Sequence, residues 1–227
     1  MTEIKLPENY SSIFAEIKTQ IEQAQIKAVI SVNQELLWLY WNIGNRILSQ
    51  KQQEGWGTKI IDRLSKDLIK EYPKLKGFST RNLKYMQKFA SYYPEHIIHA
   101  FTELWGYFKE NGFSDKSMLK LQSIDNKESE IVQEHTAQFD SHTFIESPIS
   151  RITWTHHMGL MDKLKDYPSV FWYVLNTIEH GISSNIMKMQ IDMGLFERQV
   201  ASKKITNFKK TLPPAQSDFA NYLMKDP

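Results

Sequence analysis

The chain has 227 residues, of which 41% are hydrophobic and 24% charged, a balance typical of a globular protein with a sizeable core. The absence of cysteine excludes disulfides, thiolate metal ligands and cysteine nucleophiles, and is typical of a reducing compartment. The small net charge of +2 hides an uneven distribution: residues 1–93 hold 14 basic and 9 acidic side chains, 94–148 hold 4 and 10, and 149–227 hold 10 and 7. The sequence contains neither a signal-peptide core nor an apolar stretch long enough to span a membrane, so we expect a soluble, cytoplasmic protein.

The first part of the chain predicts a long helix followed by two shorter ones. Apolar residues recur at steps of three and four from Ile13 to Ile47, which indicates one helix over 11–50. It would be about 60 Å long, so we expect it either to bend near Gly44 or to pack part of its apolar stripe on another subunit. A Gly-Trp-Gly turn at 55–57 ends it, and the shorter helices follow over 59–72, capped by Thr58, and over 80–93, capped by Ser79.

The acidic middle segment, residues 94–148, resembles an insertion between two better-organised halves and is a candidate surface for a protein partner. We expect a helix over 95–108 and a loop or weak helix over 123–144. Residues 149–212 form the second half, and 213–227 form a linker with a short helix near 217–224. Because no segment shows strand alternation, the predicted fold is all-α and multi-helical. The helices predicted in the second half cover 152–166, 168–179 and 184–199.

Two turn–helix junctions share one pattern: Gly77-Phe78-Ser79, followed by Leu83, and Gly181-Ile182-Ser183, followed by Met187. In each, glycine allows a left-handed turn, the next apolar residue fills the space between two helices, and serine caps the second helix. The apolar residue six positions after the glycine faces inward. These are the parts of a helix-turn-helix unit, although any tight helical corner can use them.

Charge favours the first unit as a DNA-binding surface. No acidic residue lies between Tyr72 and Pro94, and Arg81, Lys84 and Lys88 share with Tyr85 the face opposite the apolar residues. The alternative is an ordinary solvated face. The second unit is followed by acidic residues and favours a structural role, and the basic run after it suits either a phosphate backbone or a solvated linker. The predicted nucleic-acid-binding residues are Lys74, Lys76, Thr80, Arg81, Asn82, Lys84, Tyr85, Lys88, Ser184, Asn185, Lys188, Lys203 and Lys204.

Catalytic patterns are weak throughout the sequence. His156 and His157 are adjacent, so they point to different faces of a helix and are poorly placed to chelate one metal ion. Glu16 and Lys18 match half of a nuclease motif, but they lie on the long helix rather than on a strand. We therefore predict no metal, no cofactor, no catalytic residues and no enzymatic activity for this chain.

Several long motifs resemble the N-terminal domain of the YhcG-like family: NQELLWLYWNIG at 33–44, EGWGTKIIDRLSKDL at 54–68, GFSTRNLKYMQKFASYYP at 77–94, ITWTHH at 152–157, DKLKD at 162–166, and residues 197–227. The family is similar to PD-(D/E)xK nucleases with restriction-type and antiphage functions, and its nuclease fold lies C-terminal to this domain. The resemblance therefore implies a nuclease in a longer protein and no catalytic positions here, and the acidic segment departs from the family's pattern.

Two hypotheses follow for the function of this chain. In the first, it binds double-stranded DNA and targets the nuclease; separately, we expect a homodimer or higher oligomer formed through the N-terminal half of the long helix. In the second, it is an oligomerisation and protein-interaction module without direct DNA contact, and its basic faces are incidental. Salt-dependent binding to duplex DNA separates the two.

Overall fold

A computed structural model describes residue 7, residues 9–111 and residues 139–199 of the chain. Every regular element within these ranges is a helix, which confirms the predicted all-α class. The described helices include none with the length and apolar character needed to cross a membrane. The predictions for most of 123–144, for Lys203 and Lys204 and for the helix near 217–224 lie outside the described residues.

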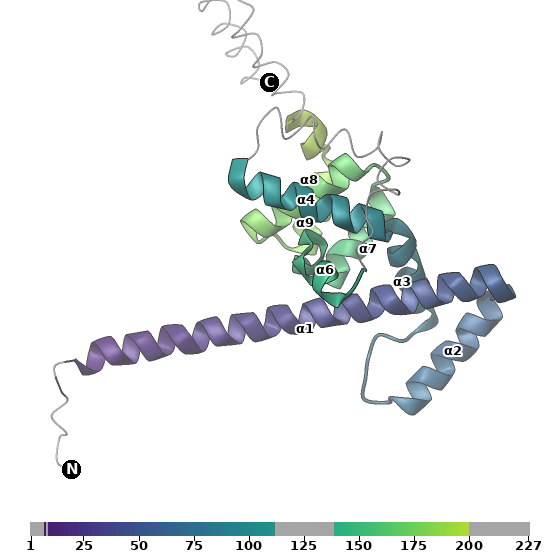
Figure 1. Cartoon of the computed structure of the whole chain (residues 1–227), viewed down its shortest axis with the longest axis horizontal. Helices are drawn as coiled ribbons and strands as arrows, with labels where there is room; N and C mark the ends of the chain where they lie inside the picture. The colour runs from purple at the N-terminus through teal and green to yellow at the C-terminus, as the bar shows by residue number, and fades with distance from the viewer. Residues whose placement is uncertain (1–6, 8, 112–138, 200–227) are drawn as a thin grey trace, which may run out of the picture.

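Helix α1, Tyr10–Glu54, confirms the long N-terminal helix and is continuous past Gly44 (Figure 1). It ends at Gly55, as the Gly-Trp-Gly turn predicted. Its two parts have different surroundings. Residues 10–32 are exposed at every position, whereas the part from Asn33 onward packs against the rest of the protein. The N-terminal part therefore projects beyond the packed helices as a rod.

Helix α3, Thr80–Tyr92, packs across the C-terminal part of α1. Gly44 makes this close contact possible, because a Cβ atom at this position would lie 2.0 Å from the carbonyl oxygen of Met86. Next to it, the indole nitrogen of Trp41 donates a hydrogen bond of 2.8 Å to the carbonyl oxygen of Tyr93. These contacts fix α3, and with it every side chain that α3 exposes, relative to α1.

Helix α2, Thr58–Glu71, packs against α3 and completes a small apolar cluster with α1 and α3. Gly57 occupies the N-cap position of α2 and Thr58 is its first residue, so the predicted Thr58 cap is wrong by one position. The hydroxyl of Ser65 donates to the carbonyl oxygen of Phe78 at 2.7 Å and ties α2 to the loop that precedes α3. The buried members of the cluster are Tyr40, Ile47, Ile61, Phe78, Leu83 and Met86.

The described ends of the acidic segment contribute to the main core. Helix α4, Glu95–Asn111, confirms the helix predicted over 95–108, and helix α6, Ser141–Glu146, lies where we expected a loop or weak helix. Both helices bury apolar side chains among those of α1, α3 and α8, such as Phe101 and Phe144. The acidic segment therefore also has apolar faces, on α4 and α6, that pack into the core of the protein.

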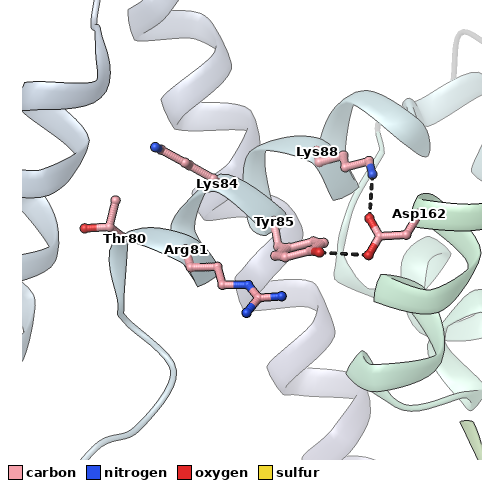
Figure 2. Close-up of a pocket in the computed structure, with 6 residues that line it drawn as sticks. All are labelled: Thr80, Arg81, Lys84, Tyr85, Lys88 and Asp162. Atoms are coloured by element: carbon pink, nitrogen blue, oxygen red, sulfur yellow. Dashed lines mark hydrogen bonds and ion pairs between the residues drawn. The ribbon is translucent and has the colours of Figure 1, made fainter. Parts of the chain in front are cut away.

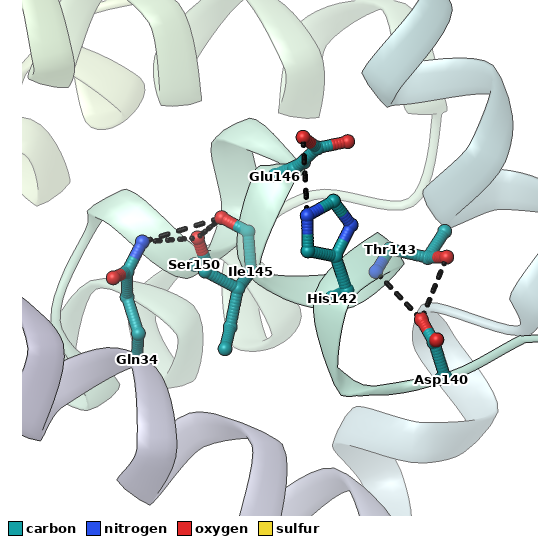
Figure 3. Close-up of polar contacts among 7 residues, drawn as sticks. All are labelled: Gln34, Asp140, His142, Thr143, Ile145, Glu146 and Ser150. Carbon is teal, nitrogen blue, oxygen red and sulfur yellow. Dashed lines mark hydrogen bonds and ion pairs between the residues drawn. The ribbon is translucent and has the colours of Figure 1, made fainter.

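Polar contacts join α6 and the turn after it to α1 (Figure 3). The side-chain amide of Gln34 donates to the carbonyl oxygen of Ile145 at 3.2 Å and to the hydroxyl of Ser150 at 3.1 Å. Asp140 caps α6 by accepting the backbone N–H of Thr143 at 2.9 Å. Since Gln34 is itself buried, these bonds satisfy polar groups that would otherwise be costly in the core.

The C-terminal half contains the 3-10 helix η2, Pro148–Arg151, and three α-helices: α7, Trp154–Lys163, α8, Tyr167–His180, and α9, Ser184–Asp192. The three α-helices were predicted, with different bounds, whereas η2 was not. The helix predicted over 152–166 begins later, because Thr153 is its N-cap. The helix predicted over 184–199 is interrupted, because the chain turns at residues 193–194 before residues 195–199 resume a helical conformation.

Candidate nucleic-acid interface

The first turn–helix junction has the local structure that its sequence predicts. Gly77 has a φ of 107°, in the left-handed region, and Phe78 is buried between helices. The side chain of Ser79 accepts the backbone N–H of Asn82 and caps α3, and Leu83 is fully buried. The connection from α2 to α3 spans residues 72–79, however, which is longer than the three or four residues of a helix-turn-helix turn.

The face of α3 that turns away from the core carries Arg81, Lys84 and Lys88, all exposed, with the half-buried Tyr85 among them. These residues line a shallow hollow of about 520 Å³ together with Thr80 and Asp162 (Figure 2). The Arg81 guanidinium lies 5.7 Å from the centre of the Tyr85 ring, and the Lys88 ammonium lies 5.9 Å from it. The sequence prediction that these side chains share one face of α3 is confirmed.

Asp162 of α7 is the acidic member of this surface (Figure 2). Its carboxylate accepts the Lys88 ammonium at 2.8 Å and the Tyr85 hydroxyl at 2.8 Å. Desolvation raises the pKa of Asp162, but the hydrogen bonds from Lys88 and Tyr85 and the charges of Lys88 and Arg81 together outweigh it and hold the pKa below its ordinary value. Within the described part of the chain, Arg81 and Lys84 form no ion pair, so they carry the uncompensated positive charge.

Asn82, one of the predicted nucleic-acid-binding residues, forms hydrogen bonds with two neighbouring segments of the protein. Its amide nitrogen donates to the carbonyl oxygen of Gly77, and its amide oxygen accepts the indole N–H of Trp154 at 2.8 Å. Both ends of the amide are therefore occupied, and contact with a base would require breaking these bonds. The contact positions α7 against α3, which also brings Asp162 to Lys88.

The other residues predicted in the first unit lie along the approach to α3. Lys74 and Lys76 are exposed in the loop that precedes the helix, and Thr80 is its half-buried first residue. Tyr72 and Leu75, in the same loop, are also exposed, at 49% and 57%. The loop therefore adds two cations and some apolar surface beside the exposed face of α3.

The second junction also has the predicted local structure. Gly181 has a φ of 58°, Ser183 caps α9, and Met187 is fully buried. The turn spans only residues 181–183, the length that a helix-turn-helix requires. Both predicted residues at the start of α9 are accessible: Ser184 is half-buried and Asn185 is exposed. The stem of Lys188 packs over Gly159 of α7, and Lys163 pairs with Asp192, so this helix is bound to its neighbour rather than open along one basic face.

Comparison with known proteins identifies the family. The DUF1016 N-terminal domain family matches residues 16–108 and 102–198, well over half of the chain. The chain belongs to this family. Each matched segment contains one of the two turn–helix junctions. No curated protein and no solved structure matches the chain.

The two adjacent histidines of this DUF1016 N-terminal domain stabilise α7. The ring of His157 lies 2.8 Å from the carbonyl oxygen of Ile149 and 3.4 Å from the Tyr93 hydroxyl, and desolvation lowers its pKa to about 3. Burial also lowers the pKa of His156, whose ring bonds to Thr153 and to the carbonyl oxygen of Ile182. Among the described residues, no three potential metal ligands cluster, and the two rings serve neighbouring backbone groups instead.

Sequence reasoning missed two residues that shape the basic surface of this DUF1016 N-terminal domain. Trp154 determines the position of the Asn82 amide, and Asp162 neutralises part of the charge of Lys88. Both come from α7, more than seventy residues after their partners Asn82 and Lys88 on α3. Asp162 follows the buried Leu160 and Met161 of α7, but no local pattern relates it to Lys88.

Proposed function

We propose that this DUF1016 N-terminal domain binds double-stranded DNA through the basic face of α3, formed by Arg81, Lys84 and Lys88. The proposal is based on the exposure of these three side chains on one side of α3, whose other side is buried in the core. Lys74 and Lys76 extend the positive surface from the preceding loop. Arginine and lysine side chains supply most of the affinity of proteins for DNA by contacting phosphates.

The spacing of these cations suits a phosphate backbone. Arg81 and Lys88 are seven residues apart, so they lie about 10 Å apart along the helix axis. One strand of B-DNA advances about 3.4 Å along its axis per phosphate, so this length corresponds to about three phosphate steps of one strand. Because Asn82 is occupied by structural bonds, the proposed contact is mainly to the backbone, with little reading of base edges.

Asp162 adjusts the strength of this proposed contact. Its carboxylate occupies the position beside Lys88 and Tyr85 that a phosphate oxygen would take in the complex. DNA would have to displace it from Lys88 and would come close to its negative charge, and both effects lower affinity. We therefore assign most of the binding free energy to Arg81 and Lys84, which form no ion pair within the described residues.

The resemblance to the YhcG-like family supports a further part of the proposal. We propose that the domain targets a PD-(D/E)xK-type nuclease to DNA, in restriction or antiphage defence, with the catalytic residues supplied by another part of the full protein. The described residues offer no cluster of potential metal ligands of the kind that such a nuclease needs. The domain's own contribution would be the affinity for DNA.

Binding of a fluorescent duplex of arbitrary sequence, measured by anisotropy, tests the proposal. Replacing Arg81, Lys84 and Lys88 together with alanine should weaken binding at least tenfold without loss of helical signal, because all three side chains are exposed. The matched control replaces three exposed lysines on other elements and changes the net charge equally. Equal affinities of the two triple variants, or no binding by the wild type at micromolar protein, would contradict the proposal. The control lysines are Lys27, Lys51 and Lys109.

A further inference from the structure

The N-terminal part of α1 is an unsupported helix. From Tyr10 to Val32 every residue is exposed, so this stretch of about 35 Å contacts no other described element (Figure 1). Eleven of the eighteen large hydrophobic side chains that the described residues expose belong to α1. Two of them, Tyr10 and Phe14, stack their rings on the helix surface with centroids 6.2 Å apart.

The composition of this stretch argues that a single copy would not remain helical by itself. It contains Ile13, Ile17, Thr19, Ile21 and other β-branched residues, which lose side-chain freedom in a helix and have low helix propensity. Its ion pair between Lys18 and Glu22, at 3.8 Å on the surface, contributes little. A lone helix of this length is only marginally stable in water even with favourable composition, so packing must supply the remainder.

Four of the exposed large apolar residues, followed by three small residues, form a heptad pattern along one side of the helix, whereas Ile26, Val29 and Ile30 lie off this side. Alternating steps of four and three define a seam from the first residue of α1 almost to the point where the packed helices begin. Two α-helices with this spacing wind around each other and interlock their seam side chains. The residues of the seam are Tyr10, Phe14, Ile17, Ile21, Ala24, Ala28 and Ser31.

We propose that the seam pairs with the same seam of a second copy of this chain, in a two-stranded coiled coil. The helix from Tyr10 to Val32 carries two acidic and two basic side chains, so two copies meet without net repulsion. The small residues Ala24, Ala28 and Ser31 allow close approach over the second half of the seam. Because this inference rests on α1 alone, it is independent of the proposed DNA contact on α3.

The exposed apolar area of α1 lies on the seam and beside it. Taking about 160 Å² for each large side chain, the exposed hydrophobic residues on all sides of α1 present on the order of 900 Å², of which the four large seam residues present roughly 330 Å². An interface of the ~800 Å² that each partner usually contributes would therefore also cover apolar residues beside the seam. Leu36 and Leu39, beside the core residue Leu37, are 37% and 45% exposed and extend the apolar surface toward the body.

Light scattering coupled to gel filtration of the full chain tests this inference. The wild type should have the mass of a dimer at tens of micromolar. Ile17→Glu with Ile21→Glu should reduce the dimer fraction at least tenfold, because both place charge in the seam. The matched control is Thr19→Glu with Gln23→Glu, which adds the same charge with the same spacing on the opposite side of the helix. It should remain dimeric.

A second variant keeps the test decisive if the charged variant unfolds. The chain has no cysteine, so a single Ile21→Cys near the middle of the seam should form a disulfide-linked dimer under mild oxidation, whereas Gln23→Cys should not. A monomeric wild type, equal dissociation of the seam and control variants, or equal cross-linking at both positions would overturn the proposal.

Discussion

Replacing Gly44 with alanine tests the contact that holds the proposed DNA-binding helix in place. The added Cβ atom would lie 2.0 Å from the carbonyl oxygen and 2.7 Å from the carbonyl carbon of Met86, and 2.9 Å from the Cβ atom of Ala90. The obstacle is mainly the backbone of α3, which cannot rotate away as a side chain can. Helices α1 and α3 would therefore have to separate by about 1 Å, which disturbs the close packing of the core.

The expected cost follows from two opposing effects. Overpacking of a core costs about 1–3 kcal/mol, and a backbone clash belongs at the upper end of that range or above it. Alanine is the better helix former by about 1 kcal/mol, which offsets part of the cost. We therefore expect Gly44→Ala to lower the free energy of unfolding by about 2–3 kcal/mol.

Gly106→Ala is the matched control for this substitution. Gly106 also lies within a helix, α4, but a Cβ atom there would have nothing within 4 Å. This variant should gain about 1 kcal/mol, so the two alanine variants should differ by about 3–4 kcal/mol in urea unfolding followed by far-UV circular dichroism. Equal stabilities would refute the close approach of α1 and α3.

Three further substitutions test other parts of the account. Asp162→Asn should strengthen DNA binding severalfold by removing the competing carboxylate, and an unchanged or weaker affinity would remove Asp162 from the interface. Burial lowers the pKa of His157 in the folded state to about 3, so below its ordinary pKa of 6.5 the side chain takes up a proton only in the unfolded state. The free energy of unfolding should therefore fall as pH decreases below 6.5, by about 2 kcal/mol at pH 5. His157→Gln should flatten this pH dependence of unfolding, whereas His180→Gln, at the exposed end of α8, should not. A wild type that is equally stable at pH 7 and pH 5 would contradict this role of His157. Ser79→Ala removes the cap of α3 and should cost about 1 kcal/mol, with Ser79→Asp retaining the stability of the wild type.

Local sequence patterns predicted the helices and the turns between them. Helical spacing predicted α1, and the glycine–serine pattern predicted both capped turns, since each depends on residues within one or two helical turns. The acidic middle segment was harder to interpret. Its net charge predicts an insertion, although α4 has an apolar face on which Ile97 and Phe101 are fully buried.

Contacts between distant residues could not be predicted in this way. Gly44 suggested a bend because glycine weakens a helix, whereas it allows a close approach to Met86 and Ala90 of α3, more than forty residues later. The occupied amide of Asn82 and the pairing of Lys88 with Asp162 both depend on where α7 packs. A single sequence gives the residue types at these positions, but their partners are set by tertiary packing.

The salt dependence of duplex binding tests the proposed function most directly. The dissociation constant of the wild type should rise steeply with salt, and the slope of its logarithm against the logarithm of salt concentration counts the phosphates neutralised, at about 0.9 for each. Replacing Arg81, Lys84 and Lys88 with alanine should reduce this slope by about two to three. The triple control of Lys27, Lys51 and Lys109 should leave it unchanged. A slope that is the same in the wild type and in the α3 variant would contradict DNA binding through this face.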